Sequence, residues 1–265
     1  MGGLRERNQS GQAAVESAIV LPLFVFLILG ILQLGLMHQA RLLTKYAAYK
    51  AVRAGALNSA KVDAMEKAAL AVLLPMLSVS SKGSGDMKLA HIPPVGSAAE
   101  FRAKWREASK NKILAEGSPL KHVEVTICGP TRSDVGGSGP ELDFDDPRNT
   151  APTGWRESHR TKLRVQVTFN YRMIIPFADW VIYQAARGRE LRKELRMYSK
   201  PRDPDQARYT PGPSESLLEQ AAAQKVYIAP IRATYTMRMQ SNFFLNRAAL
   251  PGSNECVFPF AYPAP

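Results

Sequence analysis

The sequence predicts an α+β protein in which a long N-terminal transmembrane helix is followed by a small domain outside the membrane. That domain combines packed helices with a few-stranded antiparallel sheet. Residues 18–37 are apolar apart from Gln33, and about 20 such residues cross ~30 Å of hydrocarbon as a helix. A helical pattern then continues to residue 77, and three later stretches alternate apolar and polar residues as half-buried strands do.

The apolar run is typical of a membrane helix rather than of a cleaved secretory signal. Pro22 and Gly30 would break a soluble helix but are tolerated in a membrane. The run exceeds the ~7–15 apolar residues of an ordinary signal peptide, and no small-x-small cleavage site follows it. Two arginines precede the run and four basic residues follow it within 41–53. A count of positive charges alone would therefore place the N-terminus on the outer side of the membrane.

Residues 40–77 continue the helical pattern, with a break expected at Asn58-Ser59 and an end near Pro75. Small residues gather on one face of this segment, where they allow another element to approach closely. They are Ala40, Ala47, Ala51, Ala54 and Gly55. This face packs either against the chain's own domain or against another subunit in a helical bundle.

The rest of the chain supplies the elements of the domain. Residues 98–114 have helical spacing, with Phe101, Trp105 and Ala108 on one face. Strands are expected at 121–128, at 161–173 and at 226–240, the last interrupted at Pro230. In the second of these strands, alternate apolar side chains should point one way; they are Leu163, Val165, Val167, Phe169 and Tyr171. Residues 78–98 and 129–160 are rich in loop-forming residues and predict loops.

Residues 179–202 predict a basic amphipathic helix. From 186 to 202 there are seven basic and two acidic residues, and Leu191, Leu195 and Tyr198 share one face. Such a helix could lie on an anionic membrane surface with Trp180 as an interfacial anchor. The interpretation that we favour is a solvated helix that docks on the domain by its apolar stripe.

Charge and motifs restrict the classes of function. A net charge of +12 favours anionic partners, but no nucleic-acid recognition signature accompanies it, so we expect no nucleic-acid partner. The four histidines are scattered, and no nucleophile, phosphate or dinucleotide motif occurs. We therefore predict no catalytic residue, no metal site and no cofactor. The acidic residues Glu141, Asp143, Asp145 and Asp146 could bind calcium, but they lack the usual loop pattern and are expected to be solvated.

The chain contains two cysteines, Cys128 and Cys256. Two are too few for a disulfide framework, and their spacing does not suit zinc. In an oxidising compartment they could form one bridge that closes a long loop. The alternative is two unrelated thiols, one of them buried in a strand.

The residues before the apolar run carry a recognisable pattern. The short polar stretch "MGGLRERNQSG" ends at Gly11, and "QAAVES" and the apolar helix follow. This arrangement resembles a type IV prepilin leader. More narrowly, "GQAAVESAIVLPLFVFLILGILQLG" resembles the TadE-like family, the pseudopilins of bacterial tight-adherence (Flp-type) pilus systems. The stretch "ARLLTKYAAYKAVRAGAL" resembles the helix that follows in that family, and residues 162–177 loosely resemble its strand-then-proline pattern.

The resemblance assigns roles to four positions. The family's cleavage glycine corresponds to Gly11, its new N-terminal residue to Gln12, its glutamate to Glu16 and its helix proline to Pro22. The family usually has an aromatic residue after the glutamate, where this chain has Ser17.

The resemblance also implies an organisation and a set of partners. Residues 1–11 would be a leader, 12–77 the membrane helix with its extension, and 78–265 a periplasmic domain. We accept this orientation against the charge count, because the residues before the span look like a prepilin leader. The implied partners are a prepilin peptidase, companion pseudopilins, the inner-membrane assembly platform with its ATPase, and inner-membrane lipid. The choice between homo-oligomer and hetero-oligomer stays open, as does incorporation into a surface pilus.

Elementary electrostatics supports a role for Glu16. A carboxylate at mid-membrane costs about 2.5–3.5 kcal/mol even on lenient scales, so such a group usually has a partner. Cleavage after Gly11 would create an ammonium group on Gln12, one helical turn from Glu16. The alternative is that Glu16 lies in the headgroup zone and is solvated.

Two other classes of function stay open from the sequence. One is an unprocessed single-span protein with a ligand-binding or sensory domain. The other is a membrane-tethered envelope enzyme, which a well-formed pocket with convergent polar groups would favour.

Overall fold

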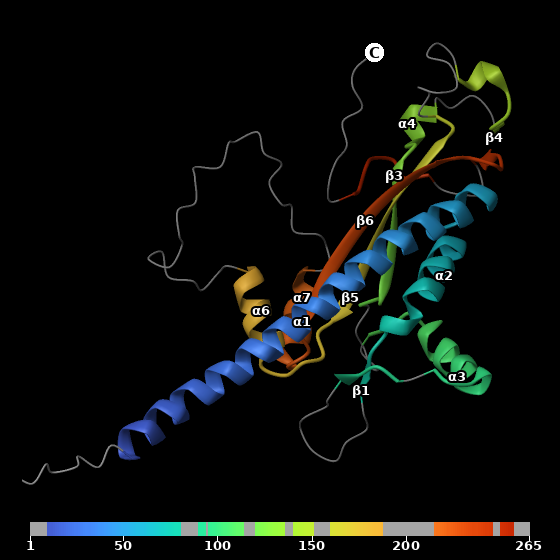
Figure 1. Ribbon diagram of the computed structural model, residues 1–265. Coiled ribbons are helices and arrows are strands. Elements are labelled where there is room, and N and C mark those ends of the chain that lie inside the picture. The colour runs from blue at the N-terminus through green and yellow to red at the C-terminus, as the bar shows by residue number, and fades with distance from the viewer. Residues whose placement is uncertain are drawn as a thin grey trace, which may run out of the picture.

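The computed structural model describes residues 10–80, 90–93, 95–113, 120–135, 140–150, 160–187, 215–245 and 250–256. It confirms the α+β class, with a long apolar N-terminal helix followed by mixed helices and small antiparallel sheets. Figure 1 shows the first helix crossing the sheet diagonally and projecting well beyond it at its N-terminal end.

The described elements follow one another in a mixed order along the chain. The helices and helical turns are α1 (Ser10–Leu57), α2 (Val62–Leu73), η1 (Leu74–Met76), α3 (Ala98–Ala108), α4 (Arg132–Val135), η2 (Pro147–Thr150), α6 (Ala178–Arg187) and α7 (Glu215–Ala223). The strands are β1 (Val79–Ser80), β2 (Ala90–His91), β3 (Val123–Gly129), β4 (Glu141–Leu142), β5 (Lys162–Arg172), β6 (Ile228–Arg238) and β7 (Phe243–Phe244).

Helix α1 has 48 residues and runs without a break through Pro22. Its N-terminal part is bare: the large apolar side chains exposed between Val15 and Leu32 have 41–66% of their surface exposed. Its C-terminal part is packed, with a buried stripe that includes Ala40, Ala47 and Ala51. One helix is therefore exposed and apolar at one end and part of a hydrophobic core at the other.

The chain turns back after Leu57, as expected at Asn58-Ser59. Ser59 and Ala60 have φ angles of 53° and 57°, a left-handed conformation that ends a helix. Helix α2 then runs back beside α1 (Figure 1) and ends at Leu73, and one 3₁₀ turn containing Pro75 follows. Both predicted boundaries are confirmed.

The central sheet has the strand order β3–β5–β6, with both pairs antiparallel. In β5, the five alternate side chains from Leu163 to Tyr171 are all buried, which confirms the predicted apolar face. The register places Val125 and Ala233 beside Val167 on this face. Helices α1 and α2 cover it, so the core lies between the helices and one side of the sheet.

Strand β6 is continuous through Pro230, so the predicted interruption is wrong. Pro230 is opposite Asn170 in an unbroken register from Ile228 to Arg238. Among the described strands, β6 lies at an edge of its sheet. A proline is tolerated there because its missing N–H can face the side without a neighbouring strand.

Several short elements also differ from the prediction. Strands β1 and β2 pair within the predicted loop 78–98, and α4, β4 and η2 lie within the predicted loop 129–160. Helix α3 ends at Ala108 rather than near residue 114, and it buries Lys104 and Ala108, while Phe101 is 46% exposed. Helix α7 was not predicted. Elements of two to four residues have no periodicity to detect, which explains why the sequence did not indicate most of them.

The C-terminal half of α1 is fixed to the sheet by close packing. At Gly55, an added Cβ would lie 2.5 Å from Met65 Sδ and 2.7 Å from Leu163 Cδ2. Beyond the helix end, Ser241 Oγ donates a hydrogen bond to the Ala56 carbonyl and accepts one from the Ser59 N–H, both at 2.8 Å. The helix end, its turn and the end of β6 are thus joined together.

We predict that Gly55→Ala lowers the free energy of unfolding by about 1–3 kcal/mol, because overpacking a filled core costs that much. The control is Gly35→Ala, where no atom lies within 4 Å of the added Cβ. Alanine favours the helix by up to ~1 kcal/mol over glycine, so the control should be neutral or slightly stabilising. Chemical unfolding of the full chain in detergent measures both. Equal stability of the two variants would contradict the packing described.

Candidate assembly site on the N-terminal helix

The proposed processing residues lie at the start of α1. Because the helix begins at Ser10, residues Gly11, Gln12 and Glu16 belong to one continuous helix. Positions 12 and 16 are four apart and therefore lie on the same face. Glu16 and Ser17 are both exposed, and the leader before residue 10 lies outside the described residues. A cut after Gly11 would leave a helix that starts one turn before Glu16.

The bare part of α1 has the character of a membrane segment. In the part of the chain that the structure describes, α1 is the one helix long and apolar enough to cross a membrane. Only 6% of its most apolar 18-residue window is buried, whereas the core helix of a soluble protein would be mostly covered. Together with the disulfide-bearing domain that follows, this is consistent with a single-pass envelope protein.

Gln33 marks the point where α1 meets the domain. Its side chain has no exposed surface, and its Oε1 accepts hydrogen bonds from the backbone N–H groups of Ile174 (3.4 Å) and Ile175 (3.0 Å). These two residues belong to the connection between β5 and α6. In the sequence, Gln33 is only an interruption of the apolar run. A lone polar residue in such a run is the signal that a specific contact forms there.

The small-residue face of α1 is directed toward the chain's own sheet. Ala40, Ala47 and Ala51 are fully buried there, and Ala54 is half-buried. Pro22 lies in the exposed part of the helix. Of the two interpretations of this face, the structure favours packing within the chain, so contacts with other subunits would use other surfaces of α1.

Cys128 and Cys256 are joined by a disulfide with a Cα–Cα distance of 5.4 Å. The bond links β3 to the segment 250–256, across a sequence separation of 128 residues. A second contact holds this segment, since the Arg132 N–H donates to the Pro251 carbonyl at 3.0 Å. Disulfides persist in oxidising compartments, so this bond agrees with a domain outside the cytoplasm.

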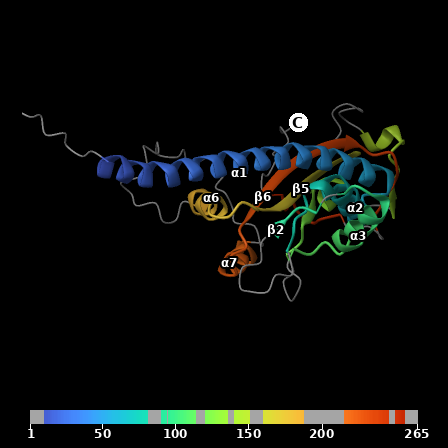
Figure 2. The same ribbon diagram turned by 60° about the horizontal axis from the view of Figure 1, so that its bottom comes forward.

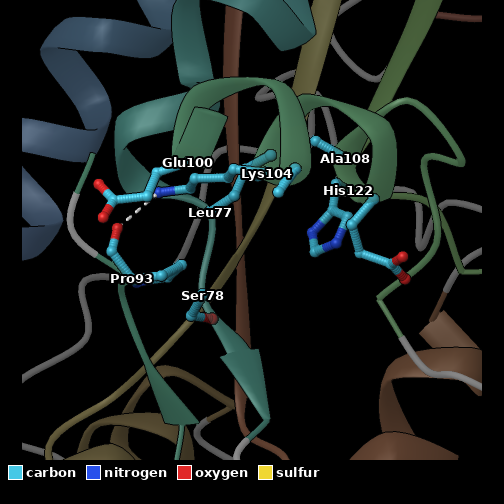
Figure 3. Close-up of a pocket in the computed structure, with 9 residues that line it drawn as sticks. Leu77, Ser78, Pro93, Glu100, Lys104, Ala108 and His122 are labelled. Atoms are coloured by element: carbon cyan, nitrogen blue, oxygen red, sulfur yellow. Dashed lines mark hydrogen bonds between the residues drawn. The ribbon is translucent and has the colours of Figure 1, made fainter. Parts of the chain in front are cut away.

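A cavity of about 320 Å³ lies between α3, the end of η1 and the start of β3. Its polar side chains are engaged separately rather than aimed at a common point (Figure 3). Lys104 Nζ donates to the Pro93 carbonyl at 3.2 Å, and Glu100 Oε2 accepts from the Gly96 and Ser97 N–H groups. Burial lowers the pKa of His122 to about 4, so its ring is neutral at neutral pH. The arrangement therefore does not favour an enzyme.

The remaining candidate sites have local roles or lie partly outside the described chain. Asp143 Oδ1 accepts from the Asp145 N–H, and Glu141 Oε1 accepts from the Asn242 side chain. Among the described residues, no group of three His, Cys, Asp or Glu side chains is placed to hold a metal ion. The predicted basic helix is described only as α6; Leu191, Leu195 and Tyr198 lie outside the described residues.

Comparison with known proteins gives a family match for most of helix α1. Residues 11–53 match the TadE-like protein family, so the chain carries a TadE-like domain at these residues. The match covers the bare part of α1 and most of its packed part, but none of the sheet. No curated protein and no solved structure matches the chain. The match thus concerns the helix whose exposed apolar part is long enough to cross a membrane and whose packed part belongs to the domain.

We predict that Gln33→Met loosens the connection between β5 and α6. The change leaves two part-buried N–H groups without their acceptor, at a cost of about 1–2 kcal/mol. Amide hydrogen exchange of residues 173–183 should become faster. Gln39→Met is the control, because Gln39 lies on the exposed side of the same helix. If both variants exchange like the parent chain, Gln33 does not hold this connection.

Proposed function

We propose that the protein is a membrane-anchored pseudopilin or minor pilin that takes part in assembly of a tight-adherence pilus. The TadE-like domain implies a role in assembly of such a pilus. One observation supports the assignment as a pseudopilin or minor pilin most. An exposed apolar helix, with Gly11 and Glu16 at its start, continues directly into a folded domain. A pilin-like subunit needs this combination, because its helix must exchange lipid for the helices of other subunits.

Processing is the first step that we propose. A prepilin peptidase of the inner membrane cuts after Gly11, and Gln12 becomes the N-terminus with a new ammonium group. Glu16 lies four residues further along the same helix, about 6 Å along its axis. Negative charge is favoured near a helix N-terminus, both by the helix dipole and by the new amine. Glu16 would pair with its own amine or with that of a neighbouring subunit.

Assembly is the second step. The apolar side chains of α1 between Val15 and Leu32 first lie in lipid and then pack against companion subunits and the assembly platform. The buried stripe of α1 stays on its own sheet throughout, because its packing and hydrogen bonds hold it there. The periplasmic domain would therefore move rigidly with the helix and present a fixed surface to its partners.

We predict that the mature protein begins at Gln12. Intact mass and N-terminal sequencing of protein purified from membranes of the native host measure this. Gly11→Leu should leave the leader in place, because glycine precedes the proposed cut. If the parent chain still begins at Met1, or begins near Arg41, the pseudopilin assignment fails and an unprocessed single-span protein is favoured.

We predict that Glu16→Ala and Glu16→Gln insert into the membrane normally but strongly reduce processing or pilus formation. Both variants lose the negative charge, and the glutamine keeps the shape of the side chain. Glu66→Gln is the control, because Glu66 pairs with Lys121 in the folded domain, at 2.8 Å. Immunoblots for the leader and electron microscopy of pili are the measurements. Wild-type piliation by Glu16→Gln would refute the role of its charge.

A further inference from the structure

We infer that the start of α6 inserts into the outer-leaflet interface of the membrane that α1 spans. The inserted surface consists of Phe177, Trp180 and Val181, here called the α6 apolar surface. This inference rests on the proposed membrane anchoring of α1. It gives the protein a second contact with lipid, and so fixes the depth and tilt of the domain.

The α6 apolar surface is one-sided and bare. Phe177 is 64% exposed, and Trp180 and Val181 are each 51% exposed. Their spacing places them on one face of the helix. The opposite face is inside the domain, where Ala178 and Tyr183 are buried and the Tyr183 ring lies 5.2 Å from that of Tyr227. The exposed side chains are therefore not a frayed end but the outer face of a docked helix.

The position of Phe177 is fixed from several sides. Its φ angle is 68°, in the left-handed region that bulky residues rarely adopt. The preceding Ile174 and Ile175 are hydrogen-bonded to Gln33 of α1. The Phe177 ring lies edge-on to Phe26 of α1, with 5.9 Å between centroids. The strained backbone at Phe177 thus holds its ring against Phe26 while most of the side chain stays exposed.

Phe26 gives the depth of this surface. From Ala14 to Gln33 the helix rises about 28 Å, which matches a hydrocarbon core of ~30 Å. Phe26 lies within this bare run, about 10 Å before Gln33 along the axis. Figures 1 and 2 both show α6 beside α1, closer to the projecting end than the other labelled elements. When α1 spans the membrane with Gln33 at its outer boundary, Phe177 is therefore level with the outer acyl chains, at the ~5–10 Å depth that interfacial helices reach, and not with bulk water.

The chemistry of the surface suits the lipid interface better than a second protein. Tryptophan is enriched at membrane–water boundaries, where its ring lies at the headgroup level. Phe177 and Val181 supply apolar area that such interfacial helices bury in the headgroup and acyl region. The surface is also continuous with the bare face of α1 through the Phe26–Phe177 contact. One lipid environment would cover both.

The consequence concerns retention in the membrane. To leave the bilayer, the chain would have to withdraw the α6 apolar surface as well as the span. Weakening this surface should therefore ease extraction without changing the fold of the domain.

Hydroxyl-radical footprinting of the unmodified full chain in lipid nanodiscs tests the inference. Phe101 on α3 is the internal control, because it is also a phenylalanine and is 46% exposed on an element distant from α6 in both views. We expect Phe177 to be oxidised at least fivefold more slowly than Phe101. Oxidation of Phe177 at the rate of Phe101 or faster would overturn the inference.

A second measurement identifies what covers the surface. In a chain whose Trp105 and Trp155 are replaced by Phe, the fluorescence of Trp180 should be quenched at least twofold by lipids brominated near the headgroup. Protection from both bromine and aqueous iodide would mean that protein covers the surface, for example a second copy, and would also overturn the inference. Flotation of the same samples with the nanodisc lipid tests the α1 anchor separately. A chain that floats but shows an unquenched Trp180 refutes only the α6 contact.

Discussion

The whole structure depends on the packing of the C-terminal half of α1 against the central sheet. Small side chains and Gly55 let the helix approach so closely that even one added carbon at residue 55 would collide with Met65 and Leu163. Hydrogen bonds hold both ends of this helix–sheet contact. The Ile175 N–H donates to Gln33 at one end, and Ser241 Oγ donates to the Ala56 carbonyl at the other. Since the same helix continues as a bare apolar rod, the domain cannot move independently of the segment that we place in the membrane.

This constraint connects the proposed steps of function. The proposed cleavage and charge pairing would act on the first turns of the rod, and the proposed subunit contacts would use its middle. A movement of the rod caused by either event would be transmitted to the domain, because no flexible joint separates the rod from the sheet within α1. The TadE-like match ends at residue 53, inside the packed half of the helix. The matched residues therefore include both the bare part and the part that carries the domain.

The sequence predicted the features that depend on long, regular patterns. The apolar run, the helix break at Asn58-Ser59 and the buried face of β5 follow from periodicity and from turn-forming residues. It did not predict the continuity of β6 through Pro230, because edge position is a property of the assembled sheet. It also did not reveal the partners of Gln33, which lie about 140 residues away in sequence. Processing after Gly11 is expected only from the resemblance to the TadE-like family, because the described part of the folded structure carries no sign of the cleavage.

We propose that the bare part of α1 contacts other pilus subunits while the packed part does not. Site-specific photocrosslinking in piliated cells tests it most directly, with the photoreactive residue at Leu23, which is 65% exposed, or at Ala51, which is fully buried. We expect adducts between Leu23 and other pilus-assembly proteins, and adducts of Ala51 only within its own chain. An absence of protein adducts at Leu23 in cells that make pili, or partner adducts at Ala51, would contradict it.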